Sequence, residues 1–238
     1  MILIIGGSGD LGNELIRNIS KENDVLVVSN KRFSDTKKIF KANSKIKNFF
    51  KVNLENPDEL DYFLKATLKK YLPVLRGMVL NYAKSLSADN LSQSKITNLF
   101  NLNYSATAII YSSILEYRRI HKSTNEFRIV NVLSNSLKTL NASSEHYIAT
   151  KASIESFSKF YAKTYGKIFV INNVAPGLMY SNLTKARFNN VEDEIIKKTP
   201  RGTLVKTVEV AEFVTYLINS SPRSLTGQTI FIDGGRTI

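Results

Sequence analysis

Short apolar runs alternate along the chain with longer stretches in which apolar residues recur every three or four positions. The short runs indicate buried strands, and the longer stretches are typical of amphipathic helices. Strands are predicted at Met1–Ile5, Val25–Ser29, Asn48–Val52, Gly77–Asn81, Phe127–Leu133, Ile168–Val174 and Thr229–Ile232. Helices are predicted between them at about 10–20, 34–42, 56–71, 92–118, 146–165 and 207–219. Because strands that alternate with helices form βαβ units, we expect a parallel sheet.

The alternation runs without interruption over 238 residues, which predicts a single domain at 1–238. Its fold class is α/β, with a doubly wound, seven-stranded parallel sheet of Rossmann type and helices on both faces. Ligands of such sheets bind beyond the carboxyl ends of the strands. The stretch Ser181–Pro200 has weak periodicity and mixed charge, and we expect it to form a flap over that edge.

The composition excludes several kinds of chemistry. With no cysteine and two histidines, the chain has no disulfide, no zinc–thiolate site, no cysteine nucleophile and no histidine-rich metal site. It opens directly on an apolar run without a basic region or a cleavage pattern, and it has no apolar span of about 20 residues. We therefore expect a soluble, cytoplasmic protein that has no membrane partner.

The net charge of +13 has two interpretations that the sequence leaves open. A basic protein attracts acidic partners. Alternatively, the lysines reflect a general compositional bias, since lysine, asparagine and isoleucine are all abundant and the basic residues are scattered. No cluster of basic and aromatic residues of the kind that binds nucleic acid is present, so we expect no nucleic-acid partner.

A glycine-rich turn follows the first predicted strand and opens the first predicted helix, at Gly6-Gly7-Ser8-Gly9-Asp10-Leu11-Gly12. Glycines let the backbone turn tightly and approach a pyrophosphate, which the N–H groups and dipole of the helix then stabilise. At the start of a βαβ pattern, this turn predicts a dinucleotide site.

The end of the second predicted strand bears on which dinucleotide binds. It reads Ser29-Asn30-Lys31-Arg32 and has no carboxylate before Asp35. A carboxylate there bonds the ribose 2′-hydroxyl of NAD, whereas basic side chains pair with the 2′-phosphate of NADP. Lys31 and Arg32 therefore favour NADP(H) over NAD(H), unless they belong only to the general lysine excess.

A tyrosine and a lysine lie four positions apart at Tyr147 and Lys151, on one face of a predicted helix. Free tyrosine, with a pKa of about 10, is a poor acid–base group at neutral pH. A neighbouring ammonium is expected to lower that pKa toward the working range. Ser134 ends the strand before this helix, and Asn103 lies in the preceding long helix.

With these residues in order, the chain resembles a single-domain short-chain dehydrogenase/reductase with the YxxxK signature, from the glycine turn to Ile232-Asp233-Gly234-Gly235. The resemblance implies a catalytic tetrad of Asn103, Ser134, Tyr147 and Lys151. Tyr147 would exchange a proton with the substrate oxygen, and Lys151 would bond the nicotinamide ribose and lower the Tyr147 pKa. Ser134 would stabilise charge on the carbonyl, and Asn103 would hold a water that links Lys151 to solvent.

Further stretches extend the implied cofactor site. Asn81-Tyr82-Ala83 resembles the family's Asn-Asn-Ala-Gly stretch, and Pro176-Gly177 resembles its Pro-Gly turn beside the nicotinamide. The expected cofactor-binding residues are Gly6, Ser8, Gly9, Asp10, Leu11, Gly12, Lys31, Arg32, Asn53, Asn81, Ala83, Tyr147, Lys151, Pro176, Gly177 and Ser181. Three positions depart from the family pattern: Asp10 replaces a glycine and is expected to cap the first helix, Asn53 replaces an acid, and Lys84 replaces a glycine.

The substrate is less defined. Among family members the chain looks closest to 3-oxoacyl-carrier-protein reductases, which implies an acyl-thioester ketone and an acidic carrier protein as partner. Basic residues expected around the rim of the site are Arg128, Lys167, Lys185, Arg187 and Arg201. A sugar or secondary-metabolite ketone, and a non-catalytic NADP-binding regulator, stay open as alternatives. The resemblance also implies a homodimer or homotetramer packed through the helices at 92–118 and 146–165.

Overall fold

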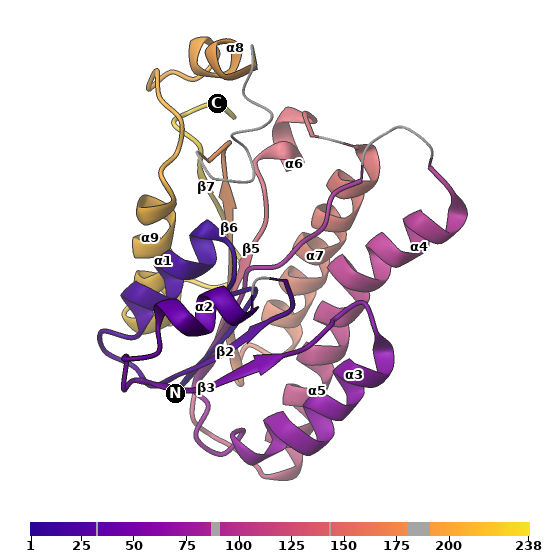
Figure 1. Cartoon of the computed structure of the whole chain (residues 1–238), viewed down its shortest axis with the longest axis vertical. Coiled ribbons are helices and arrows are strands. Elements are labelled where there is room, and N and C mark those ends of the chain that lie inside the picture. The colour runs from indigo at the N-terminus through magenta and orange to yellow at the C-terminus, as the bar shows by residue number, and fades with distance from the viewer. Residues whose placement is uncertain (32, 87–90, 143, 180–190) are drawn as a thin grey trace.

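The computed structural model describes residues 1–31, 33–86, 91–142, 144–179 and 191–238. Within these ranges a central parallel sheet is covered by helices on both faces (Figure 1). Its strands are β1 (Ile2–Ile5), β2 (Val25–Ser29), β3 (Ile46–Lys51), β4 (Gly77–Leu80), β5 (Phe127–Val132), β6 (Phe169–Pro176) and β7 (Thr229–Ile232). Their order is β3-β2-β1-β4-β5-β6-β7, and every neighbouring pair is parallel. The predicted fold class is confirmed.

The helices follow the predicted places with two additions. They are α1 (Asp10–Ile19), α2 (Phe33–Ile39), α3 (Pro57–Tyr62), α4 (Gln93–Phe100), α5 (Ala106–Ile120), α6 (Ser136–Thr139), α7 (Glu145–Thr164), α8 (Val191–Lys197) and α9 (Thr207–Asn219). The predicted helix at 56–71 begins at Pro57 and continues past α3 through a π turn and a 3₁₀ turn. The single turn α6 and the short helix α8 were not expected, because neither is long enough to establish a helical period.

The inner strands β1, β2, β4, β5 and β6 are buried on both faces, so adjacent residues of one strand pack into different cores. In β1, Ile2 and Ile4 pack into a core that includes residues of α1 and α9. Leu3 and Ile5 pack into a second core, shared with residues of α5 and α7. This two-sided burial is why the strands read as continuous apolar runs in the sequence rather than as alternating patterns.

A π turn at Asn101–Ser105 joins α4 to α5, where the sequence predicts one continuous helix. Such turns occur frequently at functional sites. This one contains Asn103, whose side chain is fully buried. The apolar period on either side is unaffected, so the pattern of the sequence could not reveal the interruption.

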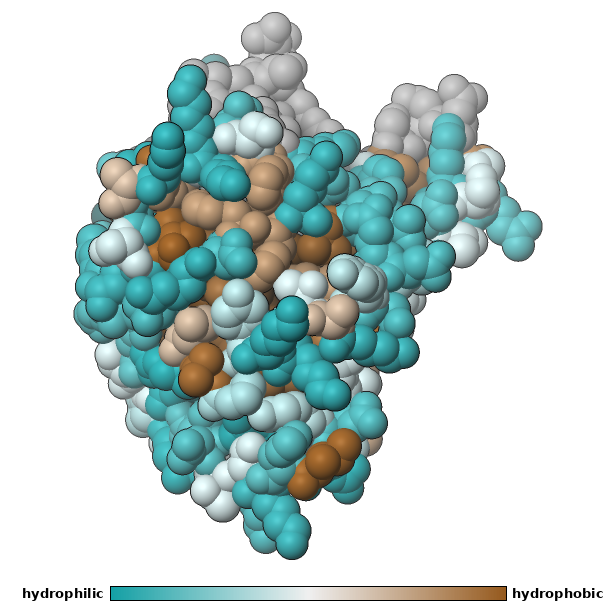
Figure 2. Space-filling model, turned by 60° about the horizontal axis from the view of Figure 1, so that its bottom comes forward, coloured by the Kyte–Doolittle hydropathy of each residue, from teal (hydrophilic) through white to brown (hydrophobic). Residues whose placement is uncertain are grey.

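On the face drawn in Figure 2, most side chains are hydrophilic, and apolar ones gather in a band near its upper centre. Among the described residues, no helix combines the length and the apolar character needed to cross a membrane.

Candidate active site

A cavity of about 480 Å³ lies at the carboxyl ends of the central strands. The turn after β1 and the segments after β2, β3 and β4 form its walls, and α7 closes one end. The structure brings most of the predicted cofactor residues together there, namely Gly6, Ser8, Gly9, Asp10, Leu11, Lys31, Asn53, Asn81, Ala83, Tyr147 and Lys151. This is the edge at which a doubly wound sheet binds its ligands.

Other predicted residues lie beside the cavity without lining it: Gly12, Asn103, Ser134, Pro176 and Gly177. Gly12 is a packing position, since a Cβ there would lie 2.4 Å from the carbonyl oxygen of Gly6. The predicted Arg32 and Ser181 lie outside the described residues, as do Lys185 and Arg187.

Two of the basic residues predicted at the rim of the site, Arg128 and Lys167, lie at the amino edge of the sheet. Arg128 is the second residue of β5, and Lys167 precedes β6, so both lie at the amino ends of their strands, opposite the cavity. Arg128 is also paired, with its Nε 2.6 Å from the carboxylate of Glu126 and its Nη1 donating to the carbonyl oxygen of Leu217 at 3.2 Å. The sequence prediction for these two residues was wrong because strand direction, not proximity in the chain, decides which edge a residue occupies.

The glycine turn exposes the start of α1 to the cavity. Gly6 has a φ of +88°, which favours glycine, and a Cβ there would lie 2.0 Å from the carbonyl oxygen of Asn81. Gly9 is the N-cap of α1, with no side chain to satisfy the first N–H groups of the helix, and nothing lies within 4 Å of where its Cβ would be. The expectation that Asp10 caps α1 was wrong, because Asp10 is the first residue of the helix and lines the cavity.

Ser29 and Asn30 at the end of β2 also line the cavity. Ser29 is only 4% exposed, and within the described chain its Oγ has no hydrogen-bond partner. Asn30 donates from Nδ2 to Oδ1 of Asn53 at 3.1 Å and thereby joins the walls after β2 and β3. An unsatisfied buried hydroxyl, an open helix N-terminus and space at Gly9 together fit a phosphorylated nucleotide, since each supplies a donor or room for one.

At the other end of the cavity, the first turns of α7 carry Tyr147 and Lys151. The N-cap Ser144 accepts from the backbone N–H of Tyr147 at 3.3 Å, which fixes where the helix begins. Lys151 is buried, and its Nζ donates to the carbonyl oxygen of Val132 at 2.8 Å. Both side chains line the same cavity as the glycine turn.

The pKa of Tyr147 differs from the sequence prediction. Burial raises the pKa of this phenol, and a hydrogen bond with Ser134 opposes the rise. Lys151 does not lower it here, because its ammonium bonds Val132 and lies 5.8 Å from the centre of the Tyr147 ring. Burial lowers the pKa of Lys151 itself to about 8. The phenol therefore stays protonated at neutral pH, and the lysine can exchange its proton near that pH.

Asn103 connects the loop after β4 to α7. Its Nδ2 donates to the carbonyl oxygen of Lys84 at 2.9 Å and to Oγ1 of Thr150 at 3.0 Å, while its Oδ1 accepts from the Lys84 N–H at 2.9 Å. Thr150 in turn donates to the carbonyl oxygen of Tyr147 at 2.8 Å. These bonds assign Asn103 a role in positioning; the implied water-holding role stays a prediction.

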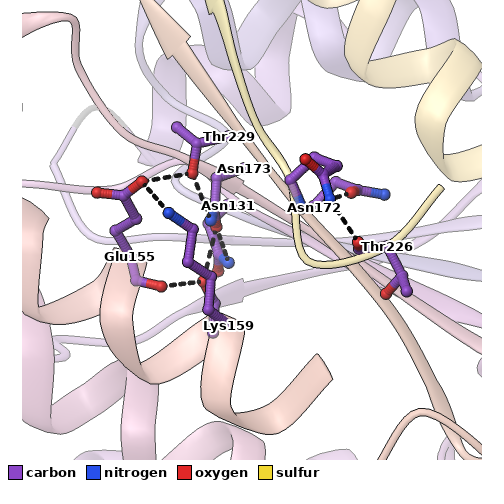
Figure 3. Close-up of polar contacts among 9 residues, drawn as sticks. Asn131, Glu155, Lys159, Asn172, Asn173, Thr226 and Thr229 are labelled. Atoms are coloured by element: carbon purple, nitrogen blue, oxygen red, sulfur yellow. Dashed lines mark hydrogen bonds and ion pairs between the residues drawn. The ribbon is translucent and has the colours of Figure 1, made fainter. Parts of the chain in front are cut away.

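The middle of α7 is bonded to the sheet by a polar network (Figure 3). Oε1 of Glu155 accepts from Oγ1 of Thr229 at 2.8 Å and from Nζ of Lys159 at 2.7 Å. Asn173 of β6 donates to Thr229 at 3.2 Å and accepts from Asn131 of β5 at 2.8 Å. Because Glu155 lies one helical turn after Lys151, these bonds fix the position of α7, and with it Tyr147 and Lys151, relative to the sheet.

Several residues that line the cavity are not among the predicted site residues. They are Ile5, Val28, Ser29, Asn30, Val52, Leu54, Glu55, Tyr82, Lys84, Leu102, Val132, Leu133, Met179 and Thr207. Ser29 and Asn30 belong to the stretch at the end of β2 in which only Lys31 and Arg32 are predicted to bind the cofactor. Lys84 is a departure from the family pattern, and its pairing with Glu55 has no signal in the sequence.

The pKa of Lys151 leads to a stability prediction. Its ordinary pKa is 10.5 and its folded value is about 8, so between pH 8 and 10 the unfolded chain binds a proton that the folded chain has released. The free energy of unfolding should therefore rise with pH through this window. Relative to Lys151→Met, which has no proton to release, the wild-type chain should gain about 2 kcal/mol between pH 8 and 10. Urea unfolding at several pH values measures this gain, and parallel profiles for the two proteins would refute it.

The sheet order and the cavity at its carboxyl edge define a Rossmann-type nucleotide-binding protein, and the tyrosine and lysine facing that cavity place it among the dehydrogenases. The family model described as enoyl-(acyl carrier protein) reductase matches residues 12–237. The chain therefore belongs to the short-chain dehydrogenase/reductase family, whose members are NAD(P)-dependent oxidoreductases.

Individual relatives are distant but cover the whole chain. The 3-oxoacyl-[acyl-carrier-protein] reductase of Rickettsia bellii is 24% identical over 98% of this chain and 95% of its own. The structure of 4-hydroxyisoleucine dehydrogenase complexed with NADH has a TM-score of 0.87 at 20% identity, covering 99% of this chain and 98% of its own. A single-substitution variant of actinorhodin polyketide ketoreductase with NADPH has a TM-score of 0.86 at 21% identity, covering 99% and 97%. At these identities the two structures show a shared fold.

Proposed function

We propose that this protein is an NADPH-dependent reductase that converts a ketone to a secondary alcohol, with Tyr147 as the acid that protonates the new hydroxyl. The observation that carries the proposal is that Tyr147 and Lys151 line the same cavity as the glycine turn at the start of α1. A dinucleotide that spans this cavity would have its pyrophosphate at the helix N-terminus and its nicotinamide beside the tyrosine.

The residues around Tyr147 suit reduction. A bound nicotinamide dinucleotide supplies the hydride, and the protein supplies position and protons. The raised pKa of Tyr147 keeps its hydroxyl protonated and ready to donate to the substrate oxygen. Ser134, hydrogen-bonded to Tyr147, would donate to the same oxygen as negative charge develops there. Lys151, with a pKa of about 8, can take up and release a proton near neutral pH and so supply the site with the proton that Tyr147 gives up.

The end of β2 supports NADPH over NADH. Lys31 is exposed at the cavity wall, where it can pair with a 2′-phosphate, and the neighbouring Ser29 carries no charge to repel one. One of the two related structures holds NADPH and the other NADH, so the preference rests on these side chains.

Exchanging Ser29 for aspartate should reverse the preference. The wild-type protein should bind NADPH at least about tenfold more tightly than NADH. In Ser29→Asp, the carboxylate would repel a 2′-phosphate but accept a hydrogen bond from a 2′-hydroxyl, so NADH should bind more tightly. Ser29→Ala, which adds no charge, should keep the wild-type order. Titration of both cofactors by fluorescence measures the affinities, and equal wild-type affinities would contradict the proposed cofactor.

Among substrates, we favour a 3-oxoacyl thioester delivered by an acidic carrier protein. The family description, the Rickettsia relative and the net charge of +13 support this choice, since basic surfaces steer acidic partners. Of the basic residues expected at the rim, Arg201 is exposed and lies near Gly234 beyond β7, at the carboxyl side of the sheet. The alternative of a sugar or secondary-metabolite ketone is compatible with the same catalytic residues.

The substrate class can be tested by following NADPH oxidation with acyl-thioester, sugar and aromatic ketones. Turnover with the acyl thioester at least about tenfold above the others would support the carrier-linked substrate. The reverse order would favour the alternative, and NADPH binding without turnover of any ketone would favour the non-catalytic regulator.

We also propose that the protein assembles as a homodimer or homotetramer through α5 and α7. Large apolar side chains that are exposed in the single chain support this: Ile109 and Ile120 on α5 are 45% and 67% exposed, and Phe160 on α7 is 58% exposed. Burying such side chains between copies removes apolar surface from water. Sedimentation of the purified protein gives the number of subunits.

A further inference from the structure

An ion pair joins two walls of the cavity. Nζ of Lys84 lies 3.1 Å and 3.2 Å from the two carboxylate oxygens of Glu55, so the ammonium contacts both oxygens. Both residues line the cavity, and their side chains are 40% and 33% exposed, which places the pair at the boundary between cavity and solvent. Glu55 belongs to the segment after β3, and Lys84 belongs to the segment after β4.

The sheet order shows that this ion pair joins segments that follow two non-adjacent strands. β3 and β4 are not neighbours, since β2 and β1 lie between them. Three strand spacings of about 4.8 Å separate β3 from β4 by roughly 14 Å. An ion pair between the segments that follow them therefore spans the width of β1 and β2 at the carboxyl edge of the sheet, where both residues line the cavity. These are the strands that carry the glycine turn and the Ser29–Lys31 wall, where the adenosine half of a dinucleotide binds.

The backbone on the Lys84 side of the pair is held by hydrogen bonds. The backbone of Lys84 is bonded in both directions to the buried amide of Asn103, at 2.9 Å each. That amide also bonds Thr150, next to Lys151 on α7. The backbone at residue 84 is therefore fixed relative to the catalytic helix, while the half-exposed side chains of Lys84 and Glu55 are free to separate and rejoin. An exposed pair of this kind contributes little energy and opens readily.

We infer that the Lys84–Glu55 ion pair is a latch across the adenosine half of the cofactor cavity, which separates to admit the dinucleotide and closes over it to slow its release. The inference rests on the proposed function, because it needs a dinucleotide in the cavity. In this interpretation Lys84 has a role that the glycine usual at this position in the family could not have, because glycine has no side chain to pair with Glu55. The latch acts on the rate of cofactor exchange.

The latch can be tested by stopped-flow measurement of NADPH release. Excess NADP⁺, whose nicotinamide is not fluorescent, displaces the bound NADPH, and the change in NADPH fluorescence gives the release rate. Glu55→Gln and Lys84→Met should each raise the release rate about two- to fivefold, the range expected for loss of an exposed pair. The wild-type release rate should also rise with salt concentration more steeply than that of either variant, because salt screens the pair. Single variants with the wild-type release rate would overturn the latch.

A charge exchange separates the pair from its individual charges. Glu55→Lys combined with Lys84→Glu reverses both charges but keeps an ion pair, so release should return to within about twofold of the wild-type rate. If Lys84 acted only by attracting phosphate, this double variant would instead release NADPH as fast as Lys84→Met or faster, and the latch would be wrong. Asp61→Asn, which breaks the pair between Asp61 on α3 and Lys65 in the π turn after it, outside the cavity, is the matched control and should leave release unchanged.

The outcomes also separate the latch from the proposed function. A wild-type protein that binds neither NADPH nor NADH would overturn the proposed function together with the latch. A protein that binds and turns over NADPH, with release rates that none of these variants changes, would retain the proposed function and lose only the latch.

Discussion

Replacing Tyr147 with phenylalanine should lower the rate of ketone reduction by a factor of about 10² to 10⁴. In the proposed mechanism the hydroxyl, which is hydrogen-bonded to Ser134, is the proton donor, and the variant keeps the ring but has no proton to give. The affinity for NADPH should change by less than about threefold, because the glycine turn, Lys31 and Lys151 remain. Steady-state oxidation of NADPH, together with a fluorescence titration of the cofactor, separates the two effects.

A second tyrosine of the same cavity provides the control. Tyr82 lines the cavity, and its hydroxyl lies 2.7 Å from Oγ1 of Thr107 on α5. Tyr82→Phe also removes a buried hydroxyl and should cost about 1 kcal/mol of stability, but it should retain most of the turnover. If Tyr147→Phe kept wild-type turnover, or if Tyr82→Phe lost as much, the assignment of the acid would be wrong.

Replacing Gly6 with alanine should destabilise the fold by about 3 to 5 kcal/mol. The φ of +88° disfavours any side chain, and the new Cβ would lie 2.0 Å from the carbonyl oxygen of Asn81, so the turn after β1 must move away from the segment after β4. Denaturant unfolding measures the loss. Because this movement would deform the cavity, NADPH binding should fall with the stability.

Gly9→Ala is the matched substitution in the same turn. Gly9 has a φ of −86°, which alanine adopts freely, and no atom lies within 4 Å of the added Cβ. Its stability should therefore change by less than about 1 kcal/mol, the cost of an alanine at a helix N-cap, whereas the methyl group at the start of α1 should weaken NADPH binding about tenfold. Equal losses of stability in Gly6→Ala and Gly9→Ala would contradict the difference in backbone conformation and crowding between the two positions.

The fold was predictable because its signals are local and repeated. Each buried strand is an apolar run, and each long helix has a regular period, so the order of elements follows from the sequence and the parallel sheet from their alternation. The π turn around Asn103 was not predictable, since it leaves the apolar period intact and depends on the bonds of Asn103 to Lys84 and Thr150. The helix α8 lies in a stretch whose pattern is too short and too charged to indicate a helix.

The candidate site was predictable where its residues follow a spacing, as with Tyr147 and Lys151 on α7 or the glycines after β1. It was not predictable where contact depends on the folded arrangement. The pKa of Tyr147 depends on burial and on where the Lys151 ammonium points, neither of which the i, i+4 spacing decides. Likewise, Glu55 and Lys84 are 29 residues apart in the sequence. They meet only because the segments after β3 and β4 both line the cavity in the folded chain.

In the proposed reaction, a hydride passes from a nicotinamide dinucleotide in this cavity to a ketone while Tyr147 supplies the proton. Its most direct test is reduction of the best ketone from the substrate screen with NADPH deuterated at C4 of the nicotinamide, followed by mass spectrometry of the alcohol. With one of the two C4-deuterated epimers, the wild-type protein should place one deuterium on the carbinol carbon, and Tyr147→Phe should form almost no product. An alcohol free of deuterium with both epimers, or equal product from the Tyr147 variant, would contradict the claim.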